Sequence, residues 1–214
     1  MLKRIECATR EEWLAARMMQ GIGASEAAAA VGMSPWMTPL DLWKLKTGQT
    51  GTKDLSGNDA VLLGVRMEPI LRDFYIKEHT EYALDYHPFD ILYREDRPWI
   101  FATLDGELTD KDGRKGILEI KTGTPNGRAG WEAWSGGQMP KNYYCQTLHQ
   151  LLATEYDFVR LFACLYSMDG TKTLKEYEIE REEVKEDLDW LLAEEKRFWG
   201  YVERREMPPM PLML

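Results

Sequence analysis

Residues 103–121 read TLDGELTDKDGRKGILEIK, and this stretch decides the predicted fold. Residues 100–108 at its start and 117–121 at its end are rich in β-branched and other apolar residues, which favour strands. The part between them holds residues typical of turns, namely Asp110, Asp112, Gly113 and Gly116. The pattern therefore predicts a β-hairpin with a polar turn.

This hairpin would gather acidic side chains. Side chains alternate along a strand, so Glu119 and Lys121 are expected on one face of the second strand. By the same rule Thr103 and Asp105 share a face of the first strand. Pairing of the two strands then brings Asp105 beside Glu119 and Lys121.

Two carboxylates at close range point to a cation. They repel each other unless positive charge lies between them, and Mg²⁺ or Mn²⁺ with oxygen ligands is a usual solution. Such an ion activates water, and a nearby lysine positions or deprotonates the attacking water. Asp105, Glu119 and Lys121 are therefore candidates for phosphodiester hydrolysis, although these residues alone also fit a solvated surface hairpin.

A calcium loop is a further interpretation of the turn. Asp110 and Asp112 resemble the start of such a loop, but its later acidic ligands are missing. We therefore interpret this segment as a turn.

Size and composition favour one domain. The chain has 214 residues, 44% of them hydrophobic, which is enough to bury a core. We expect a single domain over 1–214, with a helical part at 1–58, a catalytic core at 59–180 and a C-terminal helix and tail at 181–214. The three cysteines include no C-x-x-C pair, which argues against a disulfide framework or a zinc site.

The sequence contains no segment typical of a membrane or secreted protein. No apolar run resembles a signal peptide or reaches the length of a transmembrane helix. We therefore expect a cytoplasmic protein without membrane contact.

The distribution of charge is uneven. The formal net charge is −9, which counts against general electrostatic binding of DNA. The acids cluster at 176–206, whereas 44–77 contains many cations. We expect a basic groove on an acidic body, formed by Lys44, Lys46, Lys53, Arg66, Arg72 and Lys77.

Near the N-terminus, Thr9 and Glu12 form a capping-box pattern that begins a helix. In the following glycine- and alanine-rich segment, Ser25 is a predicted N-cap. A helix N-terminus with Arg17 close by could bind an anion such as a terminal phosphate. An ordinary capped, structural helix remains the alternative.

Two further helices carry polar residues of interest. Residues from 59 onward form a long helical pattern that includes Glu68, and NYYCQTLHQLLAT at 142–154 predicts a helix with Gln146 and Gln150 one turn apart. His149 lies beside them. We interpret His149 as a packing residue and assign it no catalytic role.

Four segments occur in one order along the chain: GIGASEAAAAVGMSPW at 21–36, GVRMEP at 64–69, TLDGE with LEIKTG between 103 and 123, and YYCQTLHQLLAT at 143–154. In this order the sequence resembles the YqaJ and lambda exonuclease family of phage recombination nucleases, over about residues 12–167. The acids resemble the D…(D/E)-x-K signature of nucleases with a restriction-endonuclease-like fold. The resemblance implies an α/β fold with a restriction-endonuclease-like core, a mixed central β-sheet flanked by helices, and an N-terminal helical lobe.

The resemblance also implies roles for the acidic residues. Asp105 and Glu119 look like the metal carboxylates, with the Ile120 carbonyl as a further ligand. Lys121 looks like the lysine that positions water. Glu68 resembles an additional acid that assists a second metal or its water.

A second set resembles residues around the scissile strand and its 5′-phosphate: Arg17, Ser25, Thr103 and Gln146. Two departures affect this set. The interval between Arg17 and Ser25 is one residue longer than in lambda exonuclease, and Thr103 replaces a serine.

The activity implied by the resemblance is Mg²⁺-dependent exonuclease digestion of linear double-stranded DNA in the 5′-to-3′ direction, with Mn²⁺ as an alternative and two ions per active site. It starts at a 5′-phosphate and leaves a 3′ overhang for a single-strand annealing protein. The family also implies a homotrimer ring around DNA. Two alternatives stay open: a structure- or site-specific endonuclease of the same superfamily, and a non-catalytic module that binds DNA ends.

Overall fold

The computed structural model describes residues 1–52 and 57–209. Lys53 of the predicted basic groove and residues 210–214 of the predicted tail lie outside this part. The helices are α1 Arg10–Gln20, α2 Ala27–Ala30, α3 Pro39–Lys46, α4 Asp59–Glu78, α5 Gly127–Glu132, α6 Lys141–Thr154 and α7 Lys185–Arg204, with 3₁₀ turns at Ala24–Glu26 and Arg181–Val184. The strands are β1 Leu2–Ile5, β2 Ile22–Gly23, β3 Ala83–Asp85, β4 Ile91–Arg94, β5 Arg97–Ala102, β6 Gly106–Thr109, β7 Lys115–Gly123, β8 Phe158–Tyr166 and β9 Lys172–Glu180.

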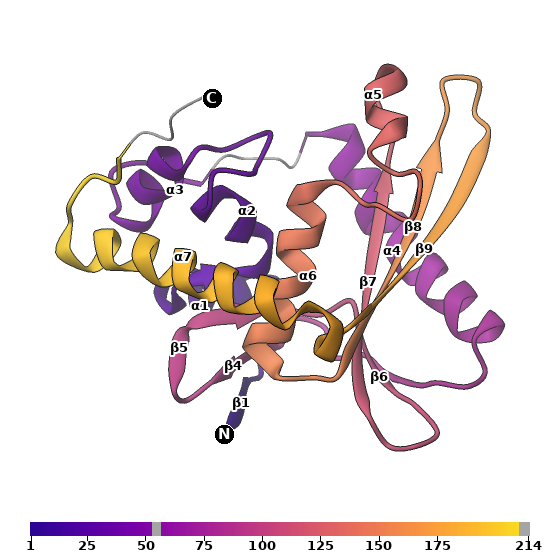
Figure 1. Cartoon of the computed structure of the whole chain (residues 1–214), viewed down its shortest axis with the longest axis horizontal. Coiled ribbons are helices and arrows are strands. Elements are labelled where there is room, and N and C mark those ends of the chain that lie inside the picture. The colour runs from indigo at the N-terminus through magenta and orange to yellow at the C-terminus, as the bar shows by residue number, and fades with distance from the viewer. Residues whose placement is uncertain (53–56, 210–214) are drawn as a thin grey trace.

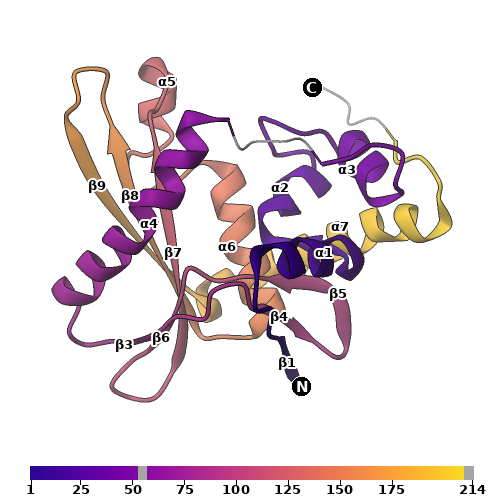
Figure 2. The same cartoon turned by 180° about the vertical axis from the view of Figure 1, so that it is seen from behind.

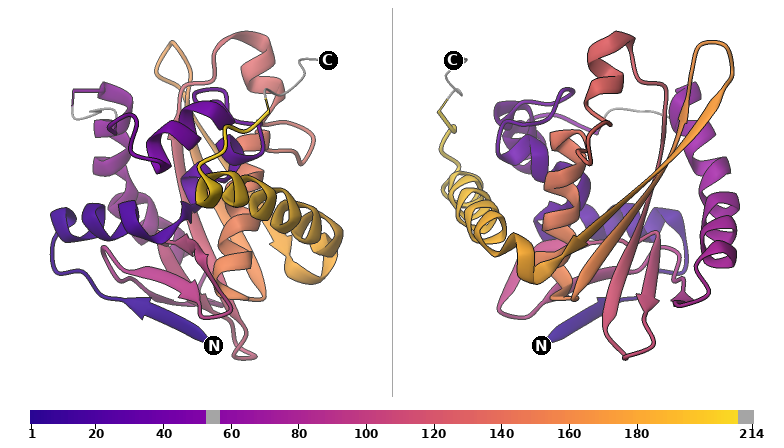
Figure 3. Two further views of the ribbon diagram at one scale, coloured as in Figure 1. Left: turned by 90° about the vertical axis from the view of Figure 1, so that its left-hand side faces the viewer. Right: turned by 45° about the vertical axis from the view of Figure 1, so that its right-hand side comes forward.

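The strands form two mixed sheets. One sheet has five strands in the order β3-β6-β7-β8-β9, and the other has four in the order β1-β4-β5-β2. Strand β7 runs parallel to β8, and α6 lies in the crossover that a parallel pair requires. Figure 3 shows α4 on one face of the five-stranded sheet and α6 on the other. The α/β fold class is confirmed, with two mixed sheets in place of one central sheet.

Each face of the larger sheet packs its own core. Leu118 and Ile120 of β7 face α4, where they join a cluster with Leu71 and Tyr75. The alternate residue Ile117 faces α6 and packs in a different cluster. Glu119 and Lys121 alternate with these α4-facing side chains, so they project toward α6.

The N-terminal part is less helical than predicted. Strand β1 pairs with β4, and β2 pairs with β5, so this part contributes strands to the smaller sheet. Helices α2 and α3 pack with α7 in a further core cluster that includes Leu42, Trp43 and Phe198. Figures 1 and 2 show α7 beside α2 and α3. The predicted division of the chain at 58 and 180 stays a prediction.

The predicted hairpin is present but its first strand is shorter. Strand β6 pairs with β7, whereas β5 ends at Ala102 and belongs to the other sheet. The chain passes between the sheets over 103–105, so the prediction that Thr103 and Asp105 share a strand face is wrong. Oδ2 of Asp105 instead accepts a hydrogen bond of 2.7 Å from the Ile120 backbone N–H, beyond the last paired residue of β6.

The turn of this hairpin is also shorter than predicted. Oδ1 of Asp110 accepts backbone N–H bonds from Asp112 at 3.0 Å and Arg114 at 2.8 Å, which closes the turn. Gly116 was predicted in the turn but lies in β7. A Cβ atom there would lie 2.0 Å from the Phe158 ring, so only glycine fits against that ring.

Ser25 is not an N-cap. It lies inside the 3₁₀ turn, and the helix after it, α2, has four residues. The N-cap of this turn is Gly23, whose backbone N–H donates a hydrogen bond of 2.8 Å to the Glu26 carboxylate. The N-cap of α1 is as predicted, because Oγ1 of Thr9 accepts the Glu12 N–H at 3.2 Å.

In the part of the chain that the structure describes, we find no helix with the length and apolar character needed to cross a membrane.

Candidate active site

Both carboxylate oxygens of Glu119, in the predicted site, have hydrogen-bond partners. Glu119 lies on β7 with 2% of its surface exposed. Nε2 of Gln146 donates to its Oε1 at 2.6 Å, and Nε2 of Gln150 donates to its Oε2. Nζ of Lys121 lies 2.5 Å from Oε1. A buried charge is costly unless it is paired and hydrogen-bonded, and here α6 and β7 supply both.

Asp105 approaches from the connection between the two sheets. Its bond to the Ile120 N–H places it at the edge of β7 that β6 leaves open. The N–H and C=O of one residue in a strand point to the same edge, so the Ile120 carbonyl faces Asp105 as well. Burial raises the pKa of Asp105 well above its usual range, and the charges of Glu119 and Glu68 raise it further.

Lys121 balances this negative charge. Burial alone would lower the pKa of its amine, but Glu119 and Asp105 raise it above the ordinary value. The side chain also lies 5.0 Å from the centroid of the Tyr143 ring on α6. These acidic neighbours favour the ammonium form of Lys121, which can position a water molecule.

Glu68 joins the group from α4. Burial raises the pKa of Glu68, and the charge of Glu119 adds to this, whereas Arg72 opposes it. Arg72 contacts both Glu68 and the Asp105 carbonyl, and Asp105 binds the residue after Glu119, so three carboxylates from α4, the 103–105 connection and β7 lie in one region.

Arg72 is a site residue that the sequence did not single out as one. It is 6% exposed and donates to the Glu68 carboxylate through one nitrogen. Its Nε donates to the Asp105 carbonyl at 2.6 Å, and its guanidinium lies 3.3 Å from the centroid of the Tyr86 ring. Arg72 thus ties α4 to the connection that carries Asp105. The four-residue spacing from Glu68 was the available sequence signal.

Two cations of the predicted basic groove have internal partners, and the groove itself stays a prediction. Arg72 is buried against Glu68 and Asp105, and Nζ of Lys46 lies 2.7 Å from Glu26. Both cations are therefore committed to internal partners, because buried charges require them.

A second polar group lies around α1. One guanidinium nitrogen of Arg17 donates to Oγ of Ser25 at 3.0 Å, and the guanidinium lies 4.6 Å from the centroid of the Trp13 ring. Nε1 of Trp13 donates to Oγ1 of Thr103 at 2.8 Å. A Cβ atom on Gly23 would lie 3.1 Å from Arg17, so this glycine leaves room for the guanidinium.

This second group is linked to the carboxylates through the chain. Thr103 precedes Asp105 by two residues, so the Trp13 bond also orients the connection between the sheets. Burial lowers the pKa of Arg17, with Glu26 opposing the shift. The prediction that Arg17 lies close to Ser25 is confirmed by their hydrogen bond, although no helix N-cap is involved.

The donors near Asp105 are suited to a hard cation. Among residues 1–52 and 57–209, no group of three or more His, Cys, Asp or Glu side chains is arranged to hold a metal ion. The available donors are the oxygens of Asp105, Glu119 and the Ile120 carbonyl, the type that Mg²⁺ prefers with water completing its shell. Oε1 of Gln150 is also buried without a hydrogen-bond partner. These residues fit a divalent cation held by few protein ligands.

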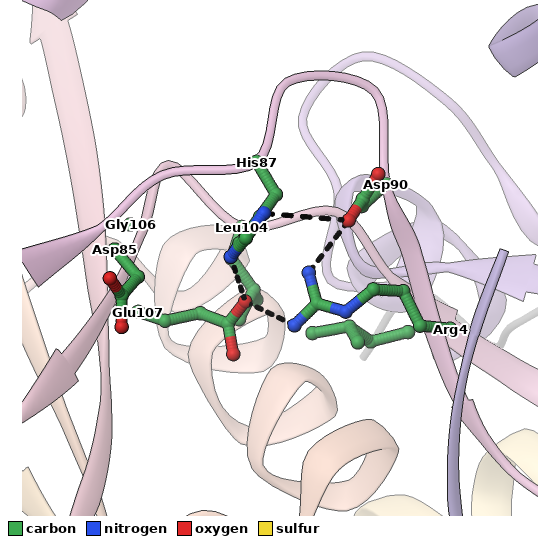
Figure 4. Close-up of a pocket in the computed structure, with 8 residues that line it drawn as sticks. Arg4, Asp85, His87, Asp90, Leu104, Gly106 and Glu107 are labelled. Atoms are coloured by element: carbon green, nitrogen blue, oxygen red, sulfur yellow. Dashed lines mark hydrogen bonds and ion pairs between the residues drawn. The ribbon is translucent and has the colours of Figure 1, made fainter. Parts of the chain in front are cut away.

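A different polar cluster fastens the N-terminal strand. Figure 4 shows Arg4 of β1 between Asp90 and Glu107, and its nitrogens lie 2.7 Å and 2.5 Å from these carboxylates. His87 lies 3.9 Å from Glu107 on the other side. This cluster joins β1 to β6.

Sequence comparison assigns the chain to a family. The sequence profile of the YqaJ-like viral recombinase domain matches residues 12–157. The chain belongs to this family. An uncharacterized protein, YqaJ of Bacillus subtilis (strain 168), is 33% identical over 195 residues, which cover 90% of this chain and 56% of that protein. The chain thus spans little more than half the length of this curated relative.

Solved structures agree with the fold of the YqaJ-like domain. An alkaline exonuclease, LHK-Exo from Laribacter hongkongensis, has a TM-score of 0.57 and 23% identity, covering 91% of this chain and 97% of that one. The structure of LHK-Exo in complex with dAMP has a TM-score of 0.54 and 24% identity, with the same coverage of 91% and 97%. The resemblance to this family is therefore confirmed, and at these identities the structural match establishes the fold.

The structure places the predicted residues of this YqaJ-like domain in two neighbouring groups. The first contains Glu68, Asp105, Glu119, Ile120, Lys121 and Gln146, and the second contains Arg17, Ser25 and Thr103. Gln146 belongs with the carboxylates because it donates to Glu119. Their functional roles stay predictions.

Proposed function

We propose that this chain is a Mg²⁺-dependent exonuclease that degrades one strand of linear double-stranded DNA in the 5′-to-3′ direction and leaves a 3′ overhang for recombination by single-strand annealing. Membership of the viral recombinase family and the alkaline exonuclease fold support a nuclease that acts in recombination. The observation that carries the proposal is the convergence of Asp105, Glu119 and Lys121 beside the open edge of β7.

Hydrolysis would use separate residues to hold the ion, to support its ligands and to orient water. Asp105, Glu119 and the Ile120 carbonyl would hold Mg²⁺ or Mn²⁺, and Glu68 would assist a second ion through water. A divalent ion held there supplies charge neutralisation and Lewis-acid activation for attack on the phosphodiester. Gln146 and Gln150 fix the Glu119 carboxylate, and the Lys121 ammonium orients the attacking water.

The second group would receive the DNA end. Arg17 and Ser25 offer a guanidinium and a hydroxyl to a 5′-phosphate, and a charge-assisted bond from Arg to phosphate is strong. Thr103 belongs to the same group and precedes Asp105 by two residues in the sequence. A terminal phosphate bound there would leave the next phosphodiester to be placed at the carboxylates.

The same proposal includes partners. The motif resemblance supports a homotrimer ring and a single-strand annealing protein that takes the 3′ overhang. Exposed apolar side chains along α4, such as Val65 and Ile70, favour a subunit contact. Light scattering after size-exclusion chromatography measures the oligomeric state directly.

One experiment tests the activity. Linear duplex DNA with a 5′-phosphate is labelled at either end and incubated with Mg²⁺ or EDTA, beside covalently closed circular duplex. We expect stepwise Mg²⁺-dependent release of the 5′ label while the circle stays intact. Cutting of the circle would assign an endonuclease, and binding without cutting of either DNA would assign a non-catalytic end-binding module.

A further inference from the structure

A buried histidine–glutamate contact lies behind the carboxylates. His149 of α6 and Glu195 of α7 are each 0% exposed, and Nδ1 of His149 lies 2.6 Å from Oε1 of Glu195. The other ring nitrogen, Nε2, lies 3.0 Å from the Phe101 carbonyl oxygen on β5. His149 thus touches two elements that are distant from α6 in sequence.

The partners determine where the hydrogens lie. A carbonyl oxygen only accepts, so Nε2 of His149 carries a hydrogen and donates it to Phe101. Nδ1 faces a carboxylate oxygen, so one proton is held between His149 and Glu195. The Phe101 carbonyl therefore fixes the hydrogen on Nε2, and the contact with Glu195 holds the other side of the ring, so the two partners together set the orientation of His149.

The elements joined by His149 support the two predicted metal carboxylates. Helix α6 bears Gln146 and Gln150, which hold both oxygens of Glu119. Strand β5 ends one residue after Phe101 and leads into the connection that carries Asp105. The bond from His149 to Phe101 thus joins the support of one carboxylate to the support of the other.

The energetics argue for more than packing. A buried ion pair is weak evidence for stability, because well-packed apolar residues of similar volume often serve as well. Oε2 of Glu195 is buried without a hydrogen-bond partner, so the pair is not fully satisfied. Apolar packing at these two positions would avoid that cost but could not donate a hydrogen bond to the Phe101 carbonyl.

We infer that His149, oriented by Glu195, is a positioning residue that sets α6 against β5 and thereby holds the Glu119 and Asp105 carboxylates at the separation a divalent cation needs. This role rests on the proposed nuclease function. It adds to that function a supporting pair that touches neither DNA nor the ion.

Matched variants separate positioning from packing. His149→Gln with Glu195→Gln keeps a donor near the place of Nε2, because a glutamine amide reaches about as far as that nitrogen. His149→Asn with Glu195→Gln is equally polar, but the shorter asparagine amide reaches only the place of Nδ1 and not the Phe101 carbonyl. His149→Leu with Glu195→Leu removes both polar groups with little change in volume, and it serves if the asparagine variant fails to fold.

The readouts are Mn²⁺ binding by calorimetry, kcat and KM on 5′-phosphorylated duplex, and the melting temperature in EDTA. Supporting residues of metal ligands are worth about 10–100-fold in metal affinity or activity. We expect loss of that size in Mn²⁺ affinity and kcat for the asparagine and leucine variants, with KM for DNA unchanged. The glutamine variant should stay close to the wild type.

Each failure has a distinct pattern. Variants that bind Mn²⁺ and turn over like the wild type, with changes only in melting temperature, would overturn the positioning role and leave the proposed function intact. Equal losses in the glutamine and asparagine variants would also overturn it, because the Phe101 bond would then be irrelevant. A wild-type chain that neither binds Mn²⁺ nor cuts DNA would defeat the proposed function and this inference together.

Discussion

Nζ of Lys121 lies 2.5 Å from Oε1 of Glu119, two residues earlier on the same strand. Both side chains project from β7 toward α6, where Gln146 and Gln150 hold the same carboxylate. The lysine is therefore one of three polar side chains that contact this buried carboxylate. A role in placing water follows from this position, because the pKa of Lys121 is raised by its acidic neighbours.

Replacement of this lysine should separate catalysis from binding. We expect Lys121→Ala to lower kcat by about 100-fold, the cost of misplacing a reacting group, while DNA binding in Ca²⁺ is retained. Lys111→Ala, in the exposed hairpin turn, is the control and should behave like the wild type. An equal loss of binding and turnover would contradict the assigned role.

Removal of one carboxylate charge should stabilise the protein in the absence of metal. The raised pKa of Asp105 means that its ionised form destabilises the fold above that pKa. Asp105→Asn keeps an acceptor for the Ile120 N–H and relieves repulsion from Glu119 and Glu68, so we expect a higher melting temperature in EDTA.

The same variant should lose nuclease activity by at least about 100-fold, more than a supporting residue costs, because a metal ligand is removed. Asp112→Asn in the exposed turn is the matched control. A lower melting temperature for Asp105→Asn in EDTA would show that the three carboxylates do not repel one another in the folded protein.

The Arg17 group should determine the preference for the chemical nature of the DNA end. Arg17→Ala removes a charged donor, and bonds to charged groups contribute roughly 1.5–3 kcal/mol. We expect KM for a 5′-phosphate duplex to rise accordingly, while KM for a 5′-hydroxyl duplex stays the same. Arg10→Ala at the start of α1 is the control, and equal effects on both substrates would exclude a phosphate pocket.

Arg72 should contribute to stability as well as to the site. Arg72→Met leaves the Glu68 carboxylate and the Asp105 carbonyl without this donor, and an unpaired buried acceptor costs about 1–3 kcal/mol. We expect that loss in urea unfolding, with part of it restored by adding Glu68→Gln. Arg66→Met, exposed on the same helix, should cost little.

Much of the local structure was predictable because its signals are local. The Thr9 cap, the turn at Asp110 and the helix with Gln146 and Gln150 each depend on residues a few positions apart. The alternation of Glu119 and Lys121 with apolar neighbours also predicted correctly that both side chains lie on one face of β7. These features follow from capping, turn chemistry and strand periodicity.

The remaining features depend on contacts between distant segments. Asp105–Gly106 is a dipeptide typical of turns, but it does not show that β5 and β6 belong to different sheets. The bond from Arg72 to the Asp105 carbonyl joins residues 33 positions apart, and the pair of His149 and Glu195 spans 46. Such partners become visible only when the sheets and helices are assembled.

Strand β9 forms one edge of the five-stranded sheet, and its side chains alternate in a way that bears on self-association. Tyr177 and Ile179 are buried, whereas Glu176 and Glu178 face outward. A long, apolar edge is a template for amyloid-like strand addition, and outward charges oppose it. Two copies meeting at β9 would bring these glutamates together, so the edge disfavours open-ended aggregation even at high protein concentration.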